Sequence, residues 1–463
     1  MRHCARKIAA LVGLSVAAVF APAAHALDLL DVWRAATLHD PGFRGALAAH
    51  DAGRARRDQA GSLWRPNVVL EGGVALASHD SAVRGARFSA PGSGQSSGVA
   101  FDTSIDDGIG SRVALSVRQP LFSREREVQG RQLQIAADAA DFEWNQAQQA
   151  LMLRSAERYF EVALAAEQLR LLTRQQTAVD RAFIEAQDRF RLGDRPIIDT
   201  QEAAARAADL KAQRLAAATE LELKRAALVD FTGLALDARP LPLPAEAPAA
   251  GDIGDLAGWL ARTEQDNPAL HLARAGLLTS EQEARKTSAA LAPSVDLVAR
   301  LGRDRLAGSG SFGSASNSVS ERSIGVQLSV PLYTGGWREA RQIEARALVD
   351  KAGAELEQAR QQVMLQTRSA WLELAVGNSQ VAALEAAAHA SRSRLDATRV
   401  GREAGDRTTL DLLNAENDAG AAELSVTRAR VRLLMNRLRL VASAGQLDEP
   451  TLRQINAALQ PAH

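Results

Sequence analysis

An internal duplication constrains the fold of this chain more than any other feature of its sequence. Two proline dipeptides recur at one offset of 227 residues (267 − 40 and 292 − 65), namely Asp40-Pro41 with Asn267-Pro268 and Arg65-Pro66 with Ala292-Pro293. Two longer segments recur at offsets of 211 and 212 residues (330 − 119 and 405 − 193), namely Gln119-Pro120-Leu121-Phe122 with Val330-Pro331-Leu332-Tyr333 and Gly193-Asp194-Arg195 with Gly405-Asp406-Arg407. A repeat of this length indicates one structural unit used twice, so we look for function in what the two repeats build together.

The first 26 residues are typical of a secretory signal. Arg2 and Arg6 precede an apolar run over residues 8–21, and residues 24–26 supply an A-x-A cleavage site. The apolar run is too short for a membrane anchor. The single cysteine, Cys4, lies in this segment, so we expect the mature chain to have no disulfide and no cysteine metal site.

Composition excludes several classes of function. The formal net charge is zero, so no polybasic surface for nucleic acid is expected. The eight histidines are scattered without metal-ligand spacing, and we expect neither a metal nor a cofactor. No apolar run of about 20 residues follows the signal, which excludes a membrane helix. A strand of an outer-membrane barrel needs only about 10 alternating residues, so a membrane location stays open.

Each repeat contains two segments with period-two alternation, which predicts strands. In the first, Val68 and Leu70 alternate with small or polar residues, and in the second the same holds for Val295 and Leu297. The segments between the strands, from Ser78 to Gly110 and from Arg303 to Ser320, are rich in Gly and Ser and are interpreted as loops. The expected strands span residues ~66–78, ~111–121, ~293–302 and ~322–333.

Alternation alone does not distinguish a soluble sheet from a membrane sheet. In the first the apolar face meets a core, and in the second it meets lipid. Aromatic residues flank the same end of every strand pair, which favours a membrane-interface girdle over simple capping of strand ends. These residues are Trp64, Phe122, Tyr333 and Trp337.

Very long helices follow the strand pairs. Residues ~124–192 and ~337–404 contain no proline, and each stretch would be on the order of 100 Å long as one helix. Apolar and small residues from Val162 to Phe190, and again from Val381 to Thr398, recur at about 3.5-residue spacing, which indicates a coiled-coil seam. Each long helix should end at a left-handed glycine, Gly193 or Gly405.

A second helix follows each glycine and completes an antiparallel hairpin.

The expected organisation is a signal at 1–26, a first repeat at 27–238, a Pro-rich linker at 239–256, a second repeat at 257–446 and an irregular tail at 447–463. In the first repeat we expect a helix broken near Asp40-Pro41, a tip at 193–196 and a returning helix at ~197–231. In the second repeat the tip is expected at 405–408 and the returning helix at ~409–443.

The tips carry a recurrent charged cluster. Asp199 and Asp411 fall in the first turns of the returning helices, where an acid complements the helix dipole. Recurrence at one offset favours a role in the tip itself over this local role, and we expect Arg195 and Arg407 to pair with acids on neighbouring helices.

Two motifs with an enzymatic appearance are rejected. Residues 308–313 fit G-x-G-x-x-G and residues 94–98 fit G-x-S-x-G, but both lie in the segments interpreted as loops and lack the strand and helix that these motifs require. We therefore expect no enzymatic activity.

With these residues in view, the chain resembles the TolC-like outer-membrane efflux proteins. The resemblance covers essentially the whole mature chain. Its most specific matches are the tips, Arg191 to Asp199 and Arg402 to Asp411, and the two strand-exit segments, Gln119 to Phe122 and Val330 to Gly336.

The resemblance implies a homotrimer in the outer membrane, where four strands per chain give a shared 12-stranded β-barrel continued by a periplasmic α-barrel. It implies an export duct of a tripartite efflux or type I secretion system, which works with a periplasmic adaptor and an inner-membrane RND or ABC pump and is surrounded by outer-membrane lipid. Gly193, Asp194, Gly405 and Asp406 would contact the adaptor.

In this family acidic residues after the second tip narrow the channel entrance. Asp411 occupies one such position, and the second is Asn414 here, which weakens the expected negative ring. The candidate entrance residues are Asp411, Asn414, Asp199, Arg407 and Arg195. Family members export drugs, metal ions or polypeptides, and the sequence leaves the cargo open.

Two other classes remain as alternatives. A periplasmic coiled-coil scaffold without a pore would leave the alternating strands and their aromatic flanks unexplained. A hydrolase that uses Ser96 of the G-x-S-x-G motif would lose its activity in a Ser96→Ala variant.

Overall fold

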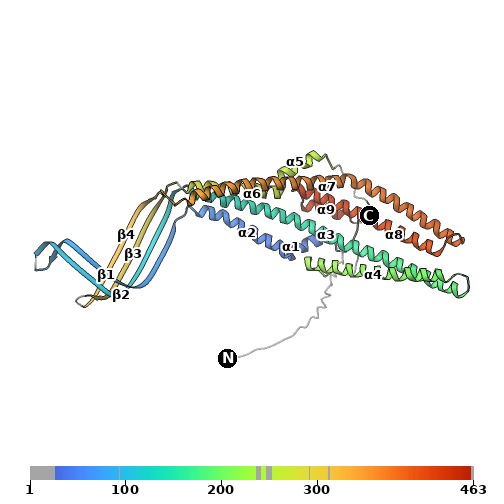
Figure 1. Ribbon diagram of the computed structural model, residues 1–463, viewed down its shortest axis with the longest axis horizontal. Coiled ribbons are helices and arrows are strands. Elements are labelled where there is room, and N and C mark those ends of the chain that lie inside the picture. The colour runs from blue at the N-terminus through green and yellow to red at the C-terminus, as the bar shows by residue number, and fades with distance from the viewer. Residues whose placement is uncertain are drawn as a thin grey trace, which may run out of the picture.

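The computed structural model describes residues 27–92, 94–194, 196–235, 241–246, 253–290, 292–310 and 313–459. They form an elongated molecule with all strands at one end and helices along the rest of its length (Figure 1). The fold class expected from the sequence, mainly α with a four-stranded sheet, is confirmed. The signal and Arg195 lie outside the described residues. Within the described ranges, no helix combines the length and the apolar character needed to cross a membrane.

The first half of the chain contributes four helices and two strands, and the second half repeats this set and adds a short last helix. In chain order the elements are α1 (Leu29–His39), α2 (Pro41–Ser62), β1 (Asn67–Ala90), β2 (Gly94–Ser123), α3 (Arg124–Arg191), α4 (Ile197–Thr232), α5 (Leu256–Asp266), α6 (Pro268–Ala289), β3 (Ser294–Gly310), β4 (Gly313–Ser329), α7 (Trp337–Glu403), α8 (Thr409–Ser443) and α9 (Glu449–Ala457).

The duplicated proline dipeptides break the chain in the same way in both repeats. Asp40 ends α1 and begins α2, and its carboxylate accepts a hydrogen bond from the Phe43 amide at 2.9 Å. Asn267 does the same between α5 and α6, where its side chain accepts from the Leu270 amide at 3.1 Å. The proline that follows each of these residues suits the first helical position because it has no N–H to satisfy.

The four strands form one antiparallel sheet in the order β1-β2-β3-β4. Residues paired across an antiparallel ladder point to the same face, so the register defines two faces. The apolar face carries Val68, Leu70, Val74, Leu76, Ile109, Val113, Leu115, Val117, Val295, Leu297, Leu301, Ile324, Val326 and Leu328. The opposite, polar face carries Glu71, Arg112, Ser116, Arg118, Asp296, Arg300, Asp304, Glu321 and Gln327. The two faces expected from alternation are therefore present.

The loops predicted between the strands are wrong. The Gly- and Ser-rich segments continue the ladders, so that β1 and β2 pair out to Ala90 and Gly94, and β3 and β4 pair out to Gly310 and Gly313. Backbone hydrogen bonds hold a strand whatever its side chains are, and alternation disappears where both faces are polar. At its other end β4 stops at Ser329, before Pro331, which cannot donate to a ladder.

The rejected motifs consequently lie in strands and not in loops. Residues 94–98 open β2, and residues 308–313 span the end of β3 and the start of β4, with 311 and 312 outside the described residues. Neither motif leads into a helix, so the structural context that each motif requires is missing.

The long helices pack as two antiparallel hairpins, α3 with α4 and α7 with α8 (Figure 1). With 68 residues, α3 is about 100 Å long. Val162, Leu172 and Val179 of the predicted seam are buried, as are Val381 and Ala388 in α7. Three apolar clusters follow the bundle, and the largest lies midway, where α1, α3, α4, α8 and α9 meet.

The prediction of an irregular tail is wrong. Residues 449–457 form α9, whose Leu452 and Ile455 are fully buried in the largest apolar cluster. The side chain of Asn456 accepts a hydrogen bond from the Leu29 amide at 3.0 Å, which ties the end of the chain to the start of α1. A helix this short gives little periodic signal, and tertiary contacts decide its existence.

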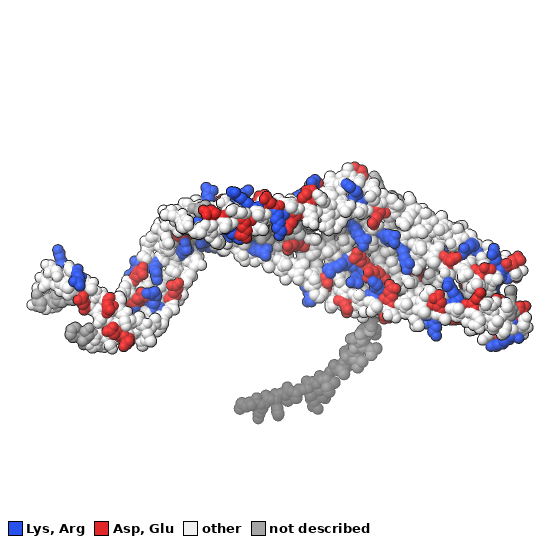
Figure 2. Space-filling view, in the orientation of Figure 1, with Lys and Arg blue, Asp and Glu red and all other residues white. Residues whose placement is uncertain are grey.

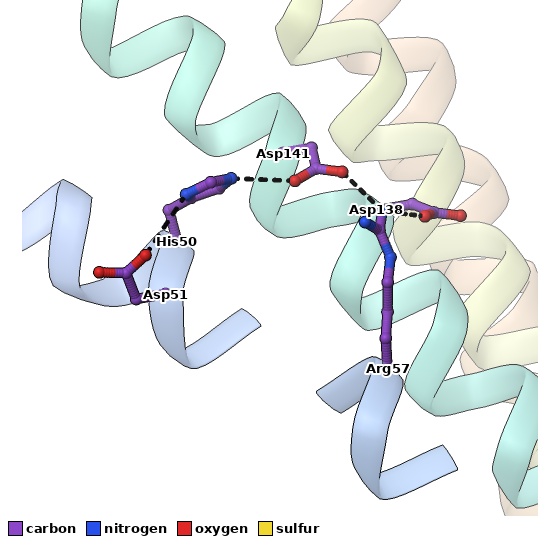
Figure 3. Close-up of polar contacts among 5 residues, drawn as sticks. All are labelled: His50, Asp51, Arg57, Asp138 and Asp141. Carbon is purple, nitrogen blue, oxygen red and sulfur yellow. Dashed lines mark hydrogen bonds and ion pairs between the residues drawn. The ribbon is translucent and has the colours of Figure 1, made fainter. Parts of the chain in front are cut away.

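A polar network attaches α2 to α3 (Figure 3). Nη2 of Arg57 contacts Asp138 at 2.9 Å and Asp141 at 2.6 Å, and Nε2 of His50 lies 3.0 Å from the same Asp141. The His50 ring also stacks on Trp144 at 5.6 Å between centroids. Because the ion pairs are exposed to solvent, the network fixes the helix register more than it adds stability.

Candidate functional site

The two helix tips, at the end of the molecule opposite the strands, share one backbone geometry (Figure 1). Gly193 and Gly405 have φ values of 76° and 87°, so the predicted left-handed caps are confirmed. In the first tip the Gly193 amide donates to the Phe190 carbonyl at 3.0 Å and the Asp194 amide to the Arg189 carbonyl at 2.9 Å. The second tip repeats both bonds, and this pair of bonds is the Schellman motif.

The returning helices begin differently in the two repeats. At α8, Thr408 and Asp411 form a capping box, in which the Asp411 amide donates to the Thr408 hydroxyl and the Thr408 amide donates to the Asp411 carboxylate, both at 3.0 Å. At α4, Pro196 occupies the cap position and no side-chain cap is present. The second tip is therefore the better fixed of the two at the start of its returning helix.

The carboxyl group of Asp411 is held ionised. The hydrogen bonds with the backbone N–H and the hydroxyl of Thr408, with a smaller contribution from the Arg407 guanidinium, lower the pKa of Asp411 below its ordinary value. Asp411 thus has the local helix-start role that the sequence offered as an alternative for it.

The structure places the helix ends next to the two tips of one chain side by side. A cavity of 120 Å³ lies between α3, α4 and α8, and Asp199 and Glu202 line it together with Thr408 and Leu413. Asp411 and Asn414 do not line this cavity. They lie one turn apart on α8, and Asn414 is exposed.

One ion pair joins the hairpins beside this cavity. Nη1 of Arg402 in α7 lies 3.4 Å from Oε2 of Glu185 in α3, and Arg189 holds the other oxygen of the same carboxylate at 2.8 Å. The sequence predicted that Arg195 and Arg407 would pair with neighbouring helices. Among the described residues of the single chain Arg407 makes no ion pair and Arg195 is outside them, so the pairing of these arginines stays a prediction. Close to the tips, Arg402 bridges the hairpins from one turn before Gly405.

The four glycine and aspartate residues predicted to contact a partner are all exposed. Gly193 and Asp194 form the outer surface of the first tip, and Gly405 and Asp406 that of the second. An added Cβ would meet nothing within 4 Å at either glycine. The tips therefore offer backbone and carboxylate groups to an external surface.

At the other end of the bundle, the predicted aromatic residues gather where the strands meet the helices. Trp64 precedes β1, Phe122 lies at the end of β2, and Tyr333 and Trp337 connect β4 to α7. Their exposed fractions run from 37 % for Trp64 to 86 % for Tyr333.

The polar face of the sheet is neutralised by ion pairs. Arg112 contacts Asp304 on the neighbouring strand at 2.7 Å, Arg118 contacts Asp296, and Arg300 lies 3.8 Å from Glu321. Only the register of β2, β3 and β4 brings these opposite charges together, so the sequence alone does not pair them. Elsewhere acidic and basic side chains are mixed over the visible surface (Figure 2).

No group of three metal-ligating side chains occurs in the part of the chain that the structure describes. The cavity near the tips and others along the chain lie between helices or strands, and Asp199 of the recurrent charged cluster lines the one near the tips.

Comparisons with known proteins agree with this geometry. The family model described as outer membrane efflux protein matches residues 32–234 and 259–446, one match for each repeat. The alkaline protease secretion protein AprF of Pseudomonas aeruginosa is 29 % identical over 94 % of this chain and 88 % of its own length. The outer membrane protein TolC of Escherichia coli is 26 % identical over 97 % of this chain and 88 % of its own length.

Solved structures share the fold. The outer-membrane channel OprN superimposes with a TM-score of 0.69 at 20 % identity, covering 90 % of each chain. The outer membrane protein VceC of Vibrio cholerae gives 0.68 at 18 % identity, over 90 % of this chain and 96 % of its own.

Proposed function

Because the chain belongs to the outer membrane efflux protein family, we propose that it forms an export duct as a homotrimer. The strands of this homotrimer would span the outer membrane, and its tips would reach a periplasmic partner. The chain is an outer-membrane channel of the efflux and type I secretion class, and its relatives are transport proteins and not enzymes.

The exposed apolar face of the sheet supports the proposal that the strands span the membrane. Leu70, Leu76, Ile324 and Val326 are 66–82 % exposed in a single chain, and a contiguous apolar surface of this kind is not left in water. We assign this face to lipid and the ion-paired polar face to the lumen. The aromatic residues Trp64, Phe122, Tyr333 and Trp337 then lie at one membrane interface.

The open edges of the sheet support three copies. β1 and β4 each have an unpaired edge, and in hydrocarbon every unpaired backbone group costs several kcal/mol. Three protomers with four strands each would close a barrel of twelve. The hairpins α3–α4 and α7–α8 would continue it as six pseudo-equivalent pairs of helices around the same axis.

We assign the channel entrance to the helix tips. Three copies of Asp411 around a narrow axis would concentrate negative charge, and the low pKa of this carboxyl keeps that charge present across the physiological range. Asn414 replaces the second acidic position, so the ring is weaker than two acids per chain would make it. Asp199, which lines the cavity between the hairpins, and Arg407 are assigned to the same entrance.

The tips would also meet the periplasmic adaptor, and through it an inner-membrane pump that supplies the energy. Gly193, Asp194, Gly405 and Asp406 are exposed in the right place for this contact. A β-branched residue in place of either glycine would have to adopt the left-handed conformation of the turn, which is unfavourable for a residue with a Cβ. We expect Gly193→Val to abolish efflux while the trimer survives. Gly353→Val, in α7 at a position where an added Cβ meets nothing within 4 Å, should leave efflux intact.

Single-channel recording in planar bilayers tests the duct and its entrance together. The wild-type trimer should conduct and be blocked by multivalent cations from the side of the tips. Asp411→Asn, which keeps an acceptor for the Thr408 amide, should raise the conductance or relieve the block. Thr408→Ala is the matched control, because it removes the cap and leaves the carboxylate. Equal effects of the two variants would refute a role for the charge, and a protein that never conducts would refute the channel.

A further inference from the structure

The six arginines in the central part of the sheet fall into two classes that the register separates. Arg112, Arg118 and Arg300 lie on the polar face, and each has an acidic partner. The other three lie on the apolar face: Arg303, Arg305 and Arg322. Among the described residues none of these three forms an ion pair.

The three arginines on the apolar face form one patch. Arg303 and Arg305 are two residues apart on β3 and therefore point to the same side. Arg322 on β4 pairs with Leu301, so it is the diagonal neighbour of Arg303, which pairs with Ser320. All three side chains are exposed, and the one polar contact in the patch is a 3.3 Å hydrogen bond from Nε of Arg303 to the Ser318 hydroxyl.

Among the described residues, no acidic side chain lies beside the three arginines on this face. By the register, the positions of β1 and β2 beside the patch are Gly72, Val74, Ser111 and Val113, and the β4 positions beyond Arg322 are serines. No acid occupies the apolar face over this part of the described strands. Three positive charges therefore stand together at the edge of a surface that is otherwise apolar.

The position of the three arginines along the strands indicates their level relative to the membrane. The stretch from Val295 to Arg303 is nine residues long, and a tilted strand needs about 9–11 residues to cross the hydrocarbon of a bilayer. In the proposed orientation Tyr333 and Trp337 mark the periplasmic end, because they lie where β4 is connected to α7. On β3 and β4 the arginines consequently lie at the outer end of the apolar stretch, which we place at the level of the outer-leaflet headgroups.

We propose that Arg303, Arg305 and Arg322 form a binding site for the phosphate groups of the outer-leaflet glycolipid. This inference rests on the proposed membrane orientation of the sheet. Guanidinium groups bind phosphate through paired N–H donors, and an arginine without a protein partner at a headgroup level is satisfied by an anionic lipid. The acyl chains of the same lipid would cover Leu301 and Ile324 next to the patch, so one molecule meets both the charge and the apolar surface.

Binding of a diphosphorylated lipid A to the purified full-length trimer in detergent, followed by native mass spectrometry, tests the site. Each Arg→Gln substitution should weaken binding about fivefold, and R303Q/R305Q/R322Q should weaken it roughly 100-fold. Arg300→Gln, on the other face of the same strand, is the control and should leave binding unchanged. If the triple variant does not assemble, the three single variants carry the test.

Further arms separate the sources of phosphate. The same lipid without its phosphates should bind the wild type as weakly as diphosphorylated lipid A binds the triple variant. Inorganic phosphate at equal concentration should not displace the lipid. Displacement by inorganic phosphate, or equal binding by wild type and triple variant, would overturn the glycolipid site.

Conductance measurements distinguish a failure of the lipid site from a failure of the proposed channel function. Wild-type protein that conducts in a phospholipid bilayer but does not discriminate the phosphorylated lipid refutes the lipid site alone. Protein that binds no lipid and forms no channel refutes the membrane assignment itself.

Discussion

Gly445 lies in the turn where α8 ends against the start of α6. Substitutions at Gly445 test whether this turn requires a glycine. Gly445 has a φ of 71°, and an added Cβ would lie 2.2 Å from the Asp266 carbonyl oxygen and 2.9 Å from its carbon. The obstacle is backbone, and it is held in place, because Asn267 donates to the Ser443 carbonyl at 2.8 Å and Gln149 donates to the Gly445 carbonyl at 2.9 Å.

Two costs add for Gly445→Ala. A left-handed conformation costs a residue with a Cβ about 1–2 kcal/mol. The overlap with a fixed carbonyl requires a backbone shift, for which overpacked sites suggest a further cost of about 1–3 kcal/mol. We therefore expect Gly445→Ala to lower the free energy of unfolding by roughly 2–5 kcal/mol.

Gly193→Ala is the matched control, because Gly193 has a φ of 76° and open space around its Cβ position. It should lose only about 1–2 kcal/mol. Asparagine tolerates the left-handed region, so Gly193→Asn should recover most of that loss, whereas Gly445→Asn should not. Denaturant unfolding followed by circular dichroism at 222 nm measures all four variants. Equal losses for the two alanine variants, or recovery in Gly445→Asn, would refute the steric reasoning.

Three further outcomes follow from the core and from the second tip. Tyr159 is fully buried and donates to the Pro242 carbonyl at 2.9 Å, so Tyr159→Phe should cost about 1–3 kcal/mol in denaturant unfolding, and a neutral result would contradict the role of this bond. Leu228→Ala opens a cavity in the same fully buried cluster and should cost about 2–5 kcal/mol; a loss below about 1 kcal/mol would argue against tight packing there. Because the folded pKa of Asp411 is lowered, its support of α8 is complete above the ordinary Asp pKa of about 3.9 and is lost as pH falls through the lowered value. Amide protection at the start of α8 should thus fall only under acid conditions, and Thr408→Ala should remove this dependence.

Much of the architecture could be predicted because it is written in local patterns. The absence of proline over about 70 residues, the glycines at 193 and 405, and the proline dipeptides at 40–41 and 267–268 act through backbone conformation, which a single residue can dictate. Alternation located the part of each strand that has one apolar face, because there the two sides of the strand meet different surroundings.

The outer parts of the strands were missed for the same reason. Beyond Leu301 most residues on both faces are polar or small, with Leu306 and Val319 as exceptions, and only the ladder between β3 and β4 shows that the strand continues. Helix α9 was missed because its nine residues are stabilised by burial against α1 and not by propensity.

The sequence by itself determined the duplication, because the recurrent motifs can be compared directly along the chain. It also determined the two hairpins, their turns and the apolar face of the sheet, since each of these depends on residues close together in the chain. Tertiary structure alone decided which charges meet. The register pairs Arg112 with Asp304 across 192 residues, packing sets Arg402 against Glu185, and the same register leaves Arg303 without an acid. Electrostatic partners are chosen by distance in space, and residues far apart in sequence acquire that distance only when strands and helices pack.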